Sequence, residues 1–484
     1  MAVHDQKTAA SNAANPMSRT RMRLLLAMAC VGSFLVNLDN TIVNVALPDM
    51  RAQLRPGVSG LQWIVDSYLL TLGSLLVLSG SLGDRYGRRR VFEVGLLIFA
   101  SGSLLSGLAP GTDWLLVFRV VQAVGASALV PVGMSIIGDV FVRPGDRAMA
   151  FSVWGGAVGL GMCAGPVLGG LLVQEWGWRA VFWIGIPVAL GAASCARLVI
   201  PDSRSARRPL FDPVGQSLVL LLLFCVIYSV IEAPEFGFSS PAIQAAVATA
   251  IAAAICLWIF ERRRAAPLID FRFFRSIPFS AAMMIAVINY SAVGGLLFLN
   301  TIYLQDVRGY TALRAGLYTL PLALGMVAGA QLASWLVRSR RPAGTRATLT
   351  IAGLLTTAAA VITIFVVGTA GTALLLIGYA LFGLGFGSVN VPVNYAVMAG
   401  MPRSQGGVAA ALGSSSRQIG QSLGVAAFGA IAGASLGTRA DRAFVPATLP
   451  CWFIVAGIGV TTIALGRLAS SRGALRSAQR ADIQ

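Results

Sequence analysis

Fourteen apolar segments, each about as long as a membrane-spanning helix, follow one another along almost the whole chain. A helix that crosses a bilayer needs about 20 mostly apolar residues. Inside lipid the backbone polar groups must bond within the segment, and a helix achieves this. The sequence therefore predicts an all-α polytopic membrane protein in the lipid bilayer, with helices at approximately 24–46, 61–80, 91–109, 114–138, 149–173, 179–199, 212–231, 241–260, 278–304, 314–337, 347–368, 372–397, 406–435 and 450–469.

The charge of the chain fits this class better than a soluble one. Charged residues make up 12% of the chain, whereas soluble domains contain about 25%. A net charge of +18 would favour nucleic-acid binding in a soluble protein. Here the arginines stand in short clusters between apolar segments, so we expect no nucleic-acid partner.

The residue types that metal sites and many enzymes use are scarce. The single histidine is His4, in the polar N-terminal tail, and the six cysteines lie in or beside apolar segments without a Cys-x-x-Cys spacing. Gly383-x-Gly-x-Gly follows no strand, so it does not indicate a dinucleotide loop. We predict no metal site and no cofactor, and a protein that is not an enzyme.

The basic residues predict the orientation. With the N-terminus in the cytoplasm, the termini and inner connections carry 28 of the 37 lysines and arginines, and the outer connections carry 7. Basic loops are retained on the cytoplasmic side. We therefore predict a multi-pass protein of the cell membrane with both termini in the cytoplasm.

Three ionisable residues stand inside apolar segments of the first half: Asp39, Asp66 and Arg119. The helical rise places them roughly 10, 8 and 9 Å from the outer ends of their segments. Ionisable residues at such depth are costly and indicate function. Arginine stays charged, so Arg119 can hold one aspartate ionised while the other exchanges a proton. This set is the candidate proton-coupling site.

Two alternatives remain open for the set. In the first, the three residues close the helices as a structural ion pair, although buried ion pairs add little stability. Asp66, near the end of its segment, would then simply be hydrated. Of the two aspartates, Asp39 is the stronger candidate for the proton carrier.

The segments from 278 to 469 contain no internal carboxylate, and their polar groups are mostly amides. A mostly apolar pocket with few polar groups is typical of small-molecule sites. The candidate substrate-cavity residues are Asn289, Asn390, Asn394 and Arg417. The alternative for such amides is contact between helices. Two interior arginines balance two aspartates, which favours a neutral, weakly basic or anionic amphiphile over a divalent cation.

A dense charged turn joins the second and third segments, Gly80-Ser-Leu-Gly-Asp-Arg-Tyr-Gly-Arg-Arg-Arg90. Alone it reads as a basic cytoplasmic turn. Its spacing resembles the loop between the second and third helices of major facilitator superfamily transporters. The resemblance implies a cytoplasmic gate in which Asp84 meets the inner ends of second-half helices near Gly406-Gly407. The implied gate residues are Gly80, Asp84, Arg85, Gly87 and Arg88.

Two further motifs resemble one branch of this superfamily, the fourteen-helix drug:proton antiporters. The first is Leu38-Asp-Asn-Thr-Ile-Val-Asn-Val-Ala-Leu-Pro48, and the second is Arg119-Val-Val-Gln-Ala-Val-Gly125. The second motif usually has glycine after the glutamine, where this chain has Ala123. The resemblance implies a coupling role for the ionisable residues in these segments.

The fifth segment reads Gly161-Met-Cys-Ala-Gly-Pro-Val-Leu-Gly-Gly170. Small residues four apart permit close helix packing, and the proline bends the helix. The pattern also resembles the element that marks exporters within the superfamily, and so it favours efflux over uptake. Its residues are Gly161, Gly165, Pro166, Gly169 and Gly170.

The resemblance extends from Arg21 to Arg467 and implies the major facilitator fold, two six-helix bundles with two extra linking helices. The expected parts are a cytoplasmic tail (1–20), a first bundle (21–200), a linker with two helices (201–265), a second bundle (266–470) and a C-terminal tail (471–484). We predict proton-coupled efflux of small amphipathic compounds such as antibiotics, by a monomer. The alternatives are a metabolite importer or facilitator, and a non-transporting membrane sensor.

Overall fold

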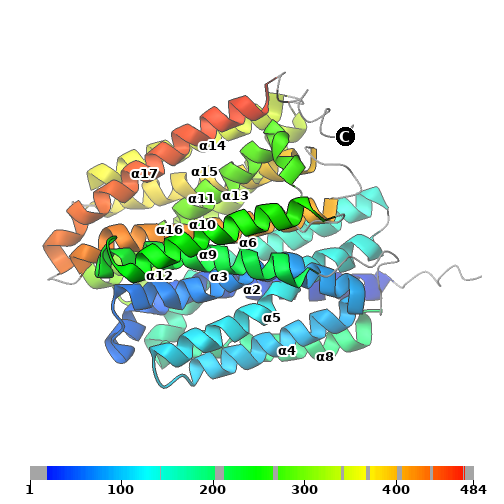
Figure 1. Cartoon of the computed structure of the whole chain (residues 1–484), viewed down its shortest axis with the longest axis horizontal. Coiled ribbons are helices and arrows are strands. Elements are labelled where there is room, and N and C mark those ends of the chain that lie inside the picture. Colours follow the sequence, from blue (N-terminus) through cyan, green and yellow to red (C-terminus); the bar gives the residue numbers. More distant parts are fainter. Residues whose placement is uncertain are drawn as a thin grey trace, which may run out of the picture.

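The computed structural model describes residues 19–141, 143–201, 212–264, 271–339, 343–366, 371–399, 406–436, 440–471 and 474. Within these ranges the chain is almost entirely helical and contains no strand. The helices lie side by side along the long axis of the molecule (Figure 1). The predicted all-α class is confirmed.

Most of the first group of helices lies on one side of the molecule, in blue to blue-green in Figure 1, with α6 nearer the middle. Within the group, α2 packs on α5 and α6, α3 on α5, and α4 on α5 and α8. Its members are α2 (Arg19–Leu54), α3 (Val58–Tyr86), α4 (Arg88–Gly107), α5 (Thr112–Val140), α6 (Pro144–Trp176), α7 (Ala180–Trp183) and α8 (Gly185–Val199).

The second group comprises the helices after residue 271. Its main contacts are α13 on α15, α11 on α16 and α14 on α17. Its members are η2 (Phe271–Arg275), α11 (Ile277–Ile302), η3 (Tyr303–Val307), α12 (Ala312–Tyr318), α13 (Leu320–Ser339), α14 (Ala343–Val366), α15 (Thr372–Ala399), α16 (Gly406–Leu436) and α17 (Ala440–Ala469).

Two helices stand between the groups in sequence, α9 (Pro213–Phe236) and α10 (Pro241–Arg262). They pack on each other, and α9 also contacts both α3 and α16. Trp63 Nε1 of α3 donates to Glu232 Oε1 of α9 at 2.7 Å. Gln216 of α9 donates to the carbonyl oxygen of Ser74 on α3. Hydrogen bonds therefore connect α9, the first helix of the α9–α10 pair, to α3.

Thirteen helical spans in the described residues are long and apolar enough to cross a membrane. The predicted segment 406–435, which is not among these thirteen, is present as α16, where the polar stretch from Ser414 to Gln421 interrupts the apolar run. The predicted number of spans therefore agrees with the helices of the structure.

Several helices extend past the predicted segments. The α2 helix continues to Leu54, although the apolar segment ends at 46, and α17 begins ten residues before the predicted 450. Hydropathy detects the lipid-facing part of a helix, whereas backbone bonding continues into water. The polar last turns of α2 bind the connection after α6, because Asp49 Oδ2 accepts from Trp178 N at 2.9 Å. The predicted helix ends were wrong there.

Candidate functional site

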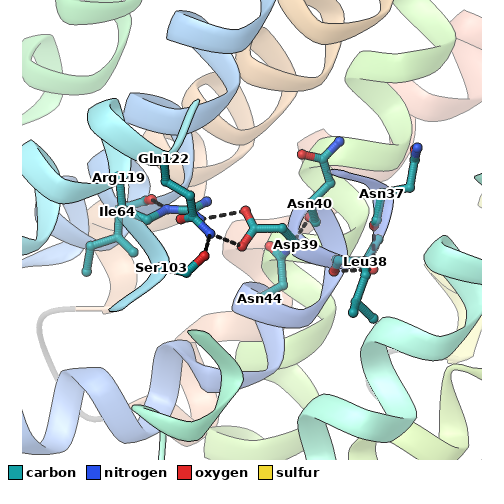
Figure 2. A network of polar contacts seen from close by, with 10 residues as sticks. Asn37, Leu38, Asp39, Asn40, Asn44, Ile64, Ser103, Arg119 and Gln122 are labelled. Carbon is teal, nitrogen blue, oxygen red and sulfur yellow. Dashed lines mark hydrogen bonds and ion pairs between the residues drawn. The ribbon is translucent and has the colours of Figure 1, made fainter. Parts of the chain in front are cut away.

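Asp39 of α2 lies inside the first group of helices, in an ion pair with Arg119 of α5. Arg119 Nη1 is 2.6 Å from Asp39 Oδ2. Gln122 Nε2 donates to Asp39 Oδ1 at 2.9 Å and to Ser103 Oγ of α4 at 2.8 Å. Figure 2 shows Asp39 pointing toward this group, while Asn37 points away from it. The network joins three helices around one carboxylate.

The Arg119 guanidinium is almost completely enclosed, with 1% of its side chain exposed. Its Nε donates to the carbonyl oxygen of Ile64 on α3 at 3.2 Å. The guanidinium carbon lies 4.2 Å from the ring centroid of Tyr68 and 5.7 Å from that of Phe182. Aromatic faces attract a cation, most strongly where water is excluded. Arg119 is therefore held by a charge, a carbonyl and two rings.

Asp66 of α3 lies apart from this network. Its side chain is fully buried, and it faces the hydroxyl of Ser422 on α16. Neither carboxyl oxygen has a hydrogen-bond partner in the described residues. The alternative that Asp66 is hydrated at a helix end is wrong, because α16 covers it. The structure thus joins Asp39 to Arg119 and places Asp66 at the seam between the two groups of helices.

A small cavity adjoins Asp39 on the side of α4 and α8. Its volume is about 10 Å³, which is about the space of one water molecule. Besides Asp39 and Ser103 it is lined mainly by apolar side chains, among them Leu38, Phe99 and Phe182. The carboxylate therefore has room beside it for one small polar molecule within otherwise apolar packing.

The small residues of α6 contact helices on two sides. A Cβ on Gly165 would lie 2.8 Å from Thr41 Cβ, and one on Gly169 would lie 2.8 Å from Ile42 Cγ1, both on α2. Gly161 likewise faces the α2 backbone. These three glycines let α6 pack directly against α2, as the small-residue spacing indicates.

The other side of α6 meets the second group. A Cβ on Gly170 would lie 2.7 Å from Leu313 Cα of α12. The carbonyl of Pro166 approaches Gly316 of the same helix. The motif therefore has two contacts, one within the first group of helices and one across to the second group.

The two groups also meet where α2 passes into α3, which we call the α2–α3 end. Gln62 Nε2 of α3 donates to the carbonyl oxygen of Ala426 on α16 at 2.7 Å. Gln305 Nε2 donates to the carbonyl oxygen of Val45 at 2.9 Å. Arg51 pairs with Asp306 at 3.6 Å. Hydrogen bonds and an ion pair thus close the α2–α3 end.

The opposite, α3–α4 end carries the predicted gate residues. Gly87 makes the turn with φ of 107°, a backbone conformation that glycine adopts without strain. Asp84 Oδ1 accepts from Arg88 Nη2 at 2.9 Å, and Arg88 also pairs with Asp139 of α5. Arg85 lies over the ring of Tyr86.

Gly80 and Gly83 complete the packing of this turn. A Cβ on Gly80 would lie 3.6 Å from Pro131 Cβ, and one on Gly83 would lie 2.9 Å from Val132 Cγ2, both on α5. Together with the Asp84–Arg88–Asp139 contacts, these tie the α3–α4 turn to the first group of helices. The predicted meeting of Asp84 with Gly406-Gly407 stays a prediction.

The predicted cavity residues separate into two places. Asn289 is buried and donates to Thr462 Oγ1 of α17 at 2.9 Å, a contact between helices. Asn394 of α15 accepts from Arg417 Nη1 of α16 at 3.0 Å. Asn390 accepts from the hydroxyl of Tyr290 on α11 at 3.0 Å. Asn390, Asn394 and Arg417 therefore form one group, and Asn289 lies elsewhere.

Sequence reasoning missed several members of these networks. Gln122 stands three residues after Arg119, a spacing that places both on one helix face, and it was thus detectable. Ser103, Tyr68 and Ser422 lie on other helices, and no local pattern distinguishes them. Their contacts depend on how each helix is rotated.

The sequence pattern of the Major Facilitator Superfamily matches residues 29–425, most of the chain. The chain belongs to this superfamily. As a superfamily member it is a multi-pass membrane transporter and not an enzyme.

Several relatives are similar over most of their length. The chain is 34% identical to the tetracenomycin C resistance and export protein of Streptomyces glaucescens, over 93% of this chain and 83% of the relative. It is 33% identical to the multidrug resistance protein Stp of Mycobacterium tuberculosis, over 87% and 77%. It is 31% identical to the multidrug efflux pump LfrA of Mycolicibacterium smegmatis, over 85% and 81%.

Solved structures of the superfamily share the fold. A bacterial homologue of the human lysosomal transporter Spinster matches with a TM-score of 0.67 at 18% identity, over 96% of this chain and 99% of that one. A POT peptide transporter in complex with sulfate matches with a TM-score of 0.67 at 17% identity, over 92% and 95%. The predicted major facilitator fold is confirmed.

Proposed function

We propose that the chain is a proton-coupled exporter of small amphipathic compounds such as antibiotics. The observation that carries the proposal is that two buried carboxyls have different surroundings. Asp39 is paired with Arg119 at 2.6 Å, whereas Asp66 has neither an ion pair nor a hydrogen bond in the described residues and lies at the seam between the two groups of helices. Asp39, beside the Arg119 cation, is suited to stay charged, and Asp66 is suited to exchange a proton.

The export direction is supported by the relatives and by α6. Relatives at 31–34% identity are named as resistance, export and efflux proteins. The glycines of α6 bring it against α2 and α12 at once, so a movement of either contact changes the other. In our proposal this element couples closure of the pathway to packing within the first bundle.

The proton step uses Asp66 in this conformation. An ionised carboxylate without a counter-charge or hydrogen bond is strongly disfavoured in apolar surroundings. Asp66 faces the Ser422 hydroxyl, and its oxygens have no hydrogen-bond partner in the described residues, so we propose that it holds a proton here. In our proposal Asp66 takes up this proton from the outer side while the seam is open at the α2–α3 end, and it releases the proton toward the cytoplasm after that end has closed. Asp39 keeps Arg119 in place and remains the alternative carrier.

We propose the orientation that the distribution of basic residues favours. With both termini in the cytoplasm, the α2–α3 end faces outward and the α3–α4 end faces the cytoplasm. Since the α2–α3 end is closed, we propose that this is the inward-facing state. In the opposite state we propose that Asp84 meets the inner end of α16, and that the bundles 21–200 and 266–470 rock about the pathway. One chain supplies both bundles, so we propose a functional monomer.

The driving force is sufficient for such a pump. A proton that crosses a potential of 100 mV releases about 2.3 kcal/mol, and each pH unit adds about 1.4 kcal/mol. Two protons per cycle would then sustain a large outward gradient of a neutral compound.

The test is a resistance panel in a host that lacks its own pumps. Wild type, Asp39→Asn and Asp66→Asn are compared at equal expression, with and without an uncoupler. We expect wild type to raise the inhibitory concentration of at least one antibiotic. The uncoupler and the Asp66→Asn substitution should each abolish this increase. Accumulation of the compound in cells that carry wild type would instead indicate an importer. Absence of any transport would indicate a sensor.

A further inference from the structure

Arg417 lies near the middle of a membrane-spanning helix with only neutral partners. Its guanidinium donates to Asn394 Oδ1 at 3.0 Å and to Ser414 Oγ at 2.9 Å. In the part of the chain that the structure describes, no carboxylate pairs with it. A cation at such depth is unfavourable unless a counter-charge or water compensates it. Within the described residues the Arg417 guanidinium therefore lacks a counter-charge, which a bound anion would supply.

The depth of Arg417 along the span can be read from the contact of the next residue, Gln418, with α3. Gln418 packs against Gly73, where a Cβ on the glycine would lie 2.9 Å from Gln418 Cβ. Gly73 lies in the middle of α3, seven residues beyond Asp66. The Arg417 group is thus near the centre of the span, nearer to the α3–α4 end than the buried carboxyl.

The side chains around Arg417 are accessible. Tyr290, Asn390 and Arg417 are half-buried and Asn394 is exposed. Asn289 and Ser388, on the same helices as Tyr290 and Asn390, are buried at 2% and 0% exposure. Tyr290, Asn390, Asn394 and Arg417 thus lie on the accessible faces of α11, α15 and α16, whereas Asn289 and Ser388 lie on the buried faces of α11 and α15.

An aromatic surface adjoins the cation. The Tyr290 hydroxyl donates to Asn390 Oδ1, and Tyr290 lies within electrostatic reach of Arg417. The Tyr290 ring packs on Phe386 with centroids 4.9 Å apart and an interplanar angle of 65°. Phe386 is 2% exposed and so backs the tyrosine ring from the protein side. The accessible ring can therefore contact a planar ligand beside the guanidinium.

We propose that Arg417 and Tyr290 form the subsite for an aromatic substrate that carries a carboxylate or phenolate. The guanidinium binds the anionic oxygen through charge-assisted hydrogen bonds, and the tyrosine ring contacts the aromatic part. Asn394 and Ser414 hold the guanidinium in place. This inference rests on the proposed export function and names the class of compound that the exporter takes.

The test compares two ligands of the same shape, 2-naphthoate and 2-naphthamide. Binding to purified full-length protein in detergent is measured by calorimetry, with gluconate as the buffer anion. We expect wild type to bind the carboxylate about tenfold or more tightly, as charged hydrogen bonds permit. Arg417→Gln should reduce the ratio to about one, and Arg417→Lys should keep part of it. Arg338→Gln, an exposed cation at the end of α13, is the matched control.

Each other outcome overturns the inference. A ratio in Arg417→Gln equal to that of wild type, or a wild type that binds neither probe or both equally, removes the anion subsite. Octanoate tests the ring, because binding as tight as that of 2-naphthoate would indicate a lipid-like anion. The resistance panel separates this failure from that of the proposed function. Export of antibiotics without anion preference defeats only the subsite, and absence of export defeats the function itself.

Discussion

Gln62 of α3 and Gly429 of α16 are directly apposed across the two groups of helices. A Cβ on Gly429 would lie 2.6 Å from Gln62 Cδ, closer than real Cβ contacts. A side chain at position 429 would displace the Gln62 amide, which donates to the carbonyl oxygen of Ala426 at 2.7 Å. The Gln62 contact, one of those that close the α2–α3 end, thus depends on the absence of a side chain at position 429.

We therefore expect Gly429→Val to hold the α2–α3 end open. The branched side chain would collide with Gln62 and separate α3 from α16. A cysteine placed at Val58 should then react faster with a membrane-impermeant thiol reagent, in a background without the six native cysteines. Antibiotic export should fall. Adding Gln62→Ala to Gly429→Val makes space and should restore slow labelling; equal labelling in all variants would show that this contact does not close the pathway.

Asp66→Asn is expected to separate stability from transport. Within the described residues neither oxygen of Asp66 accepts a hydrogen bond, so an amide of the same shape should leave the thermal unfolding midpoint close to that of wild type. Export driven by a pH gradient should be lost, because the amide cannot exchange a proton. Inverted membrane vesicles and a fluorescent substrate measure the transport. Ser422→Ala, which removes only the facing hydroxyl, is the control and should retain export. Normal pumping by Asp66→Asn would exclude Asp66 as the carrier.

The Asp39–Arg119 pair should behave as one energetic unit. Arg119→Gln leaves Asp39 buried without its counter-charge, and we expect a loss of about 3–5 kcal/mol in the free energy of unfolding. Asp39→Asn should cost a similar amount, since it leaves the arginine uncompensated. The double variant should be less destabilised than the sum, with a coupling of about 1–3 kcal/mol. Unfolding in detergent followed by tryptophan fluorescence measures all four proteins. Additive effects would mean that the pair does not act as a unit.

Much of the fold could be predicted from hydropathy because each span must satisfy its backbone within itself. The polar end of α2 and the weakly apolar α16 were the difficult parts, since their helical state depends on tertiary contacts. For the site, depth along each segment placed Asp39 and Arg119 at one level. Depth does not give the rotation of a helix. The structure turns Tyr68 of α3 toward Arg119 and Asp66 toward α16.

The same limit explains the asparagines. Asn289 and Asn390 are equivalent by sequence, as polar residues in apolar segments of the second half. One packs against Thr462 of α17 and the other lies beside Tyr290 on the accessible face. No local sequence pattern distinguishes the two asparagines, because their contacts depend on which helix packs against each face.

The glycines of α6 offer a comparison within one helix. Gly165 faces α2 so closely that a Cβ would lie 2.8 Å from Thr41 Cβ, whereas a Cβ on Gly156 would meet nothing within 4 Å. Gly165→Ala should therefore push α6 away from α2 and lower both the unfolding midpoint and the export rate. Gly156→Ala should be neutral or stabilising by up to about 1 kcal/mol, because alanine favours the helix. If both substitutions have the same effect on export, the close packing of α6 on α2 is not what transport requires.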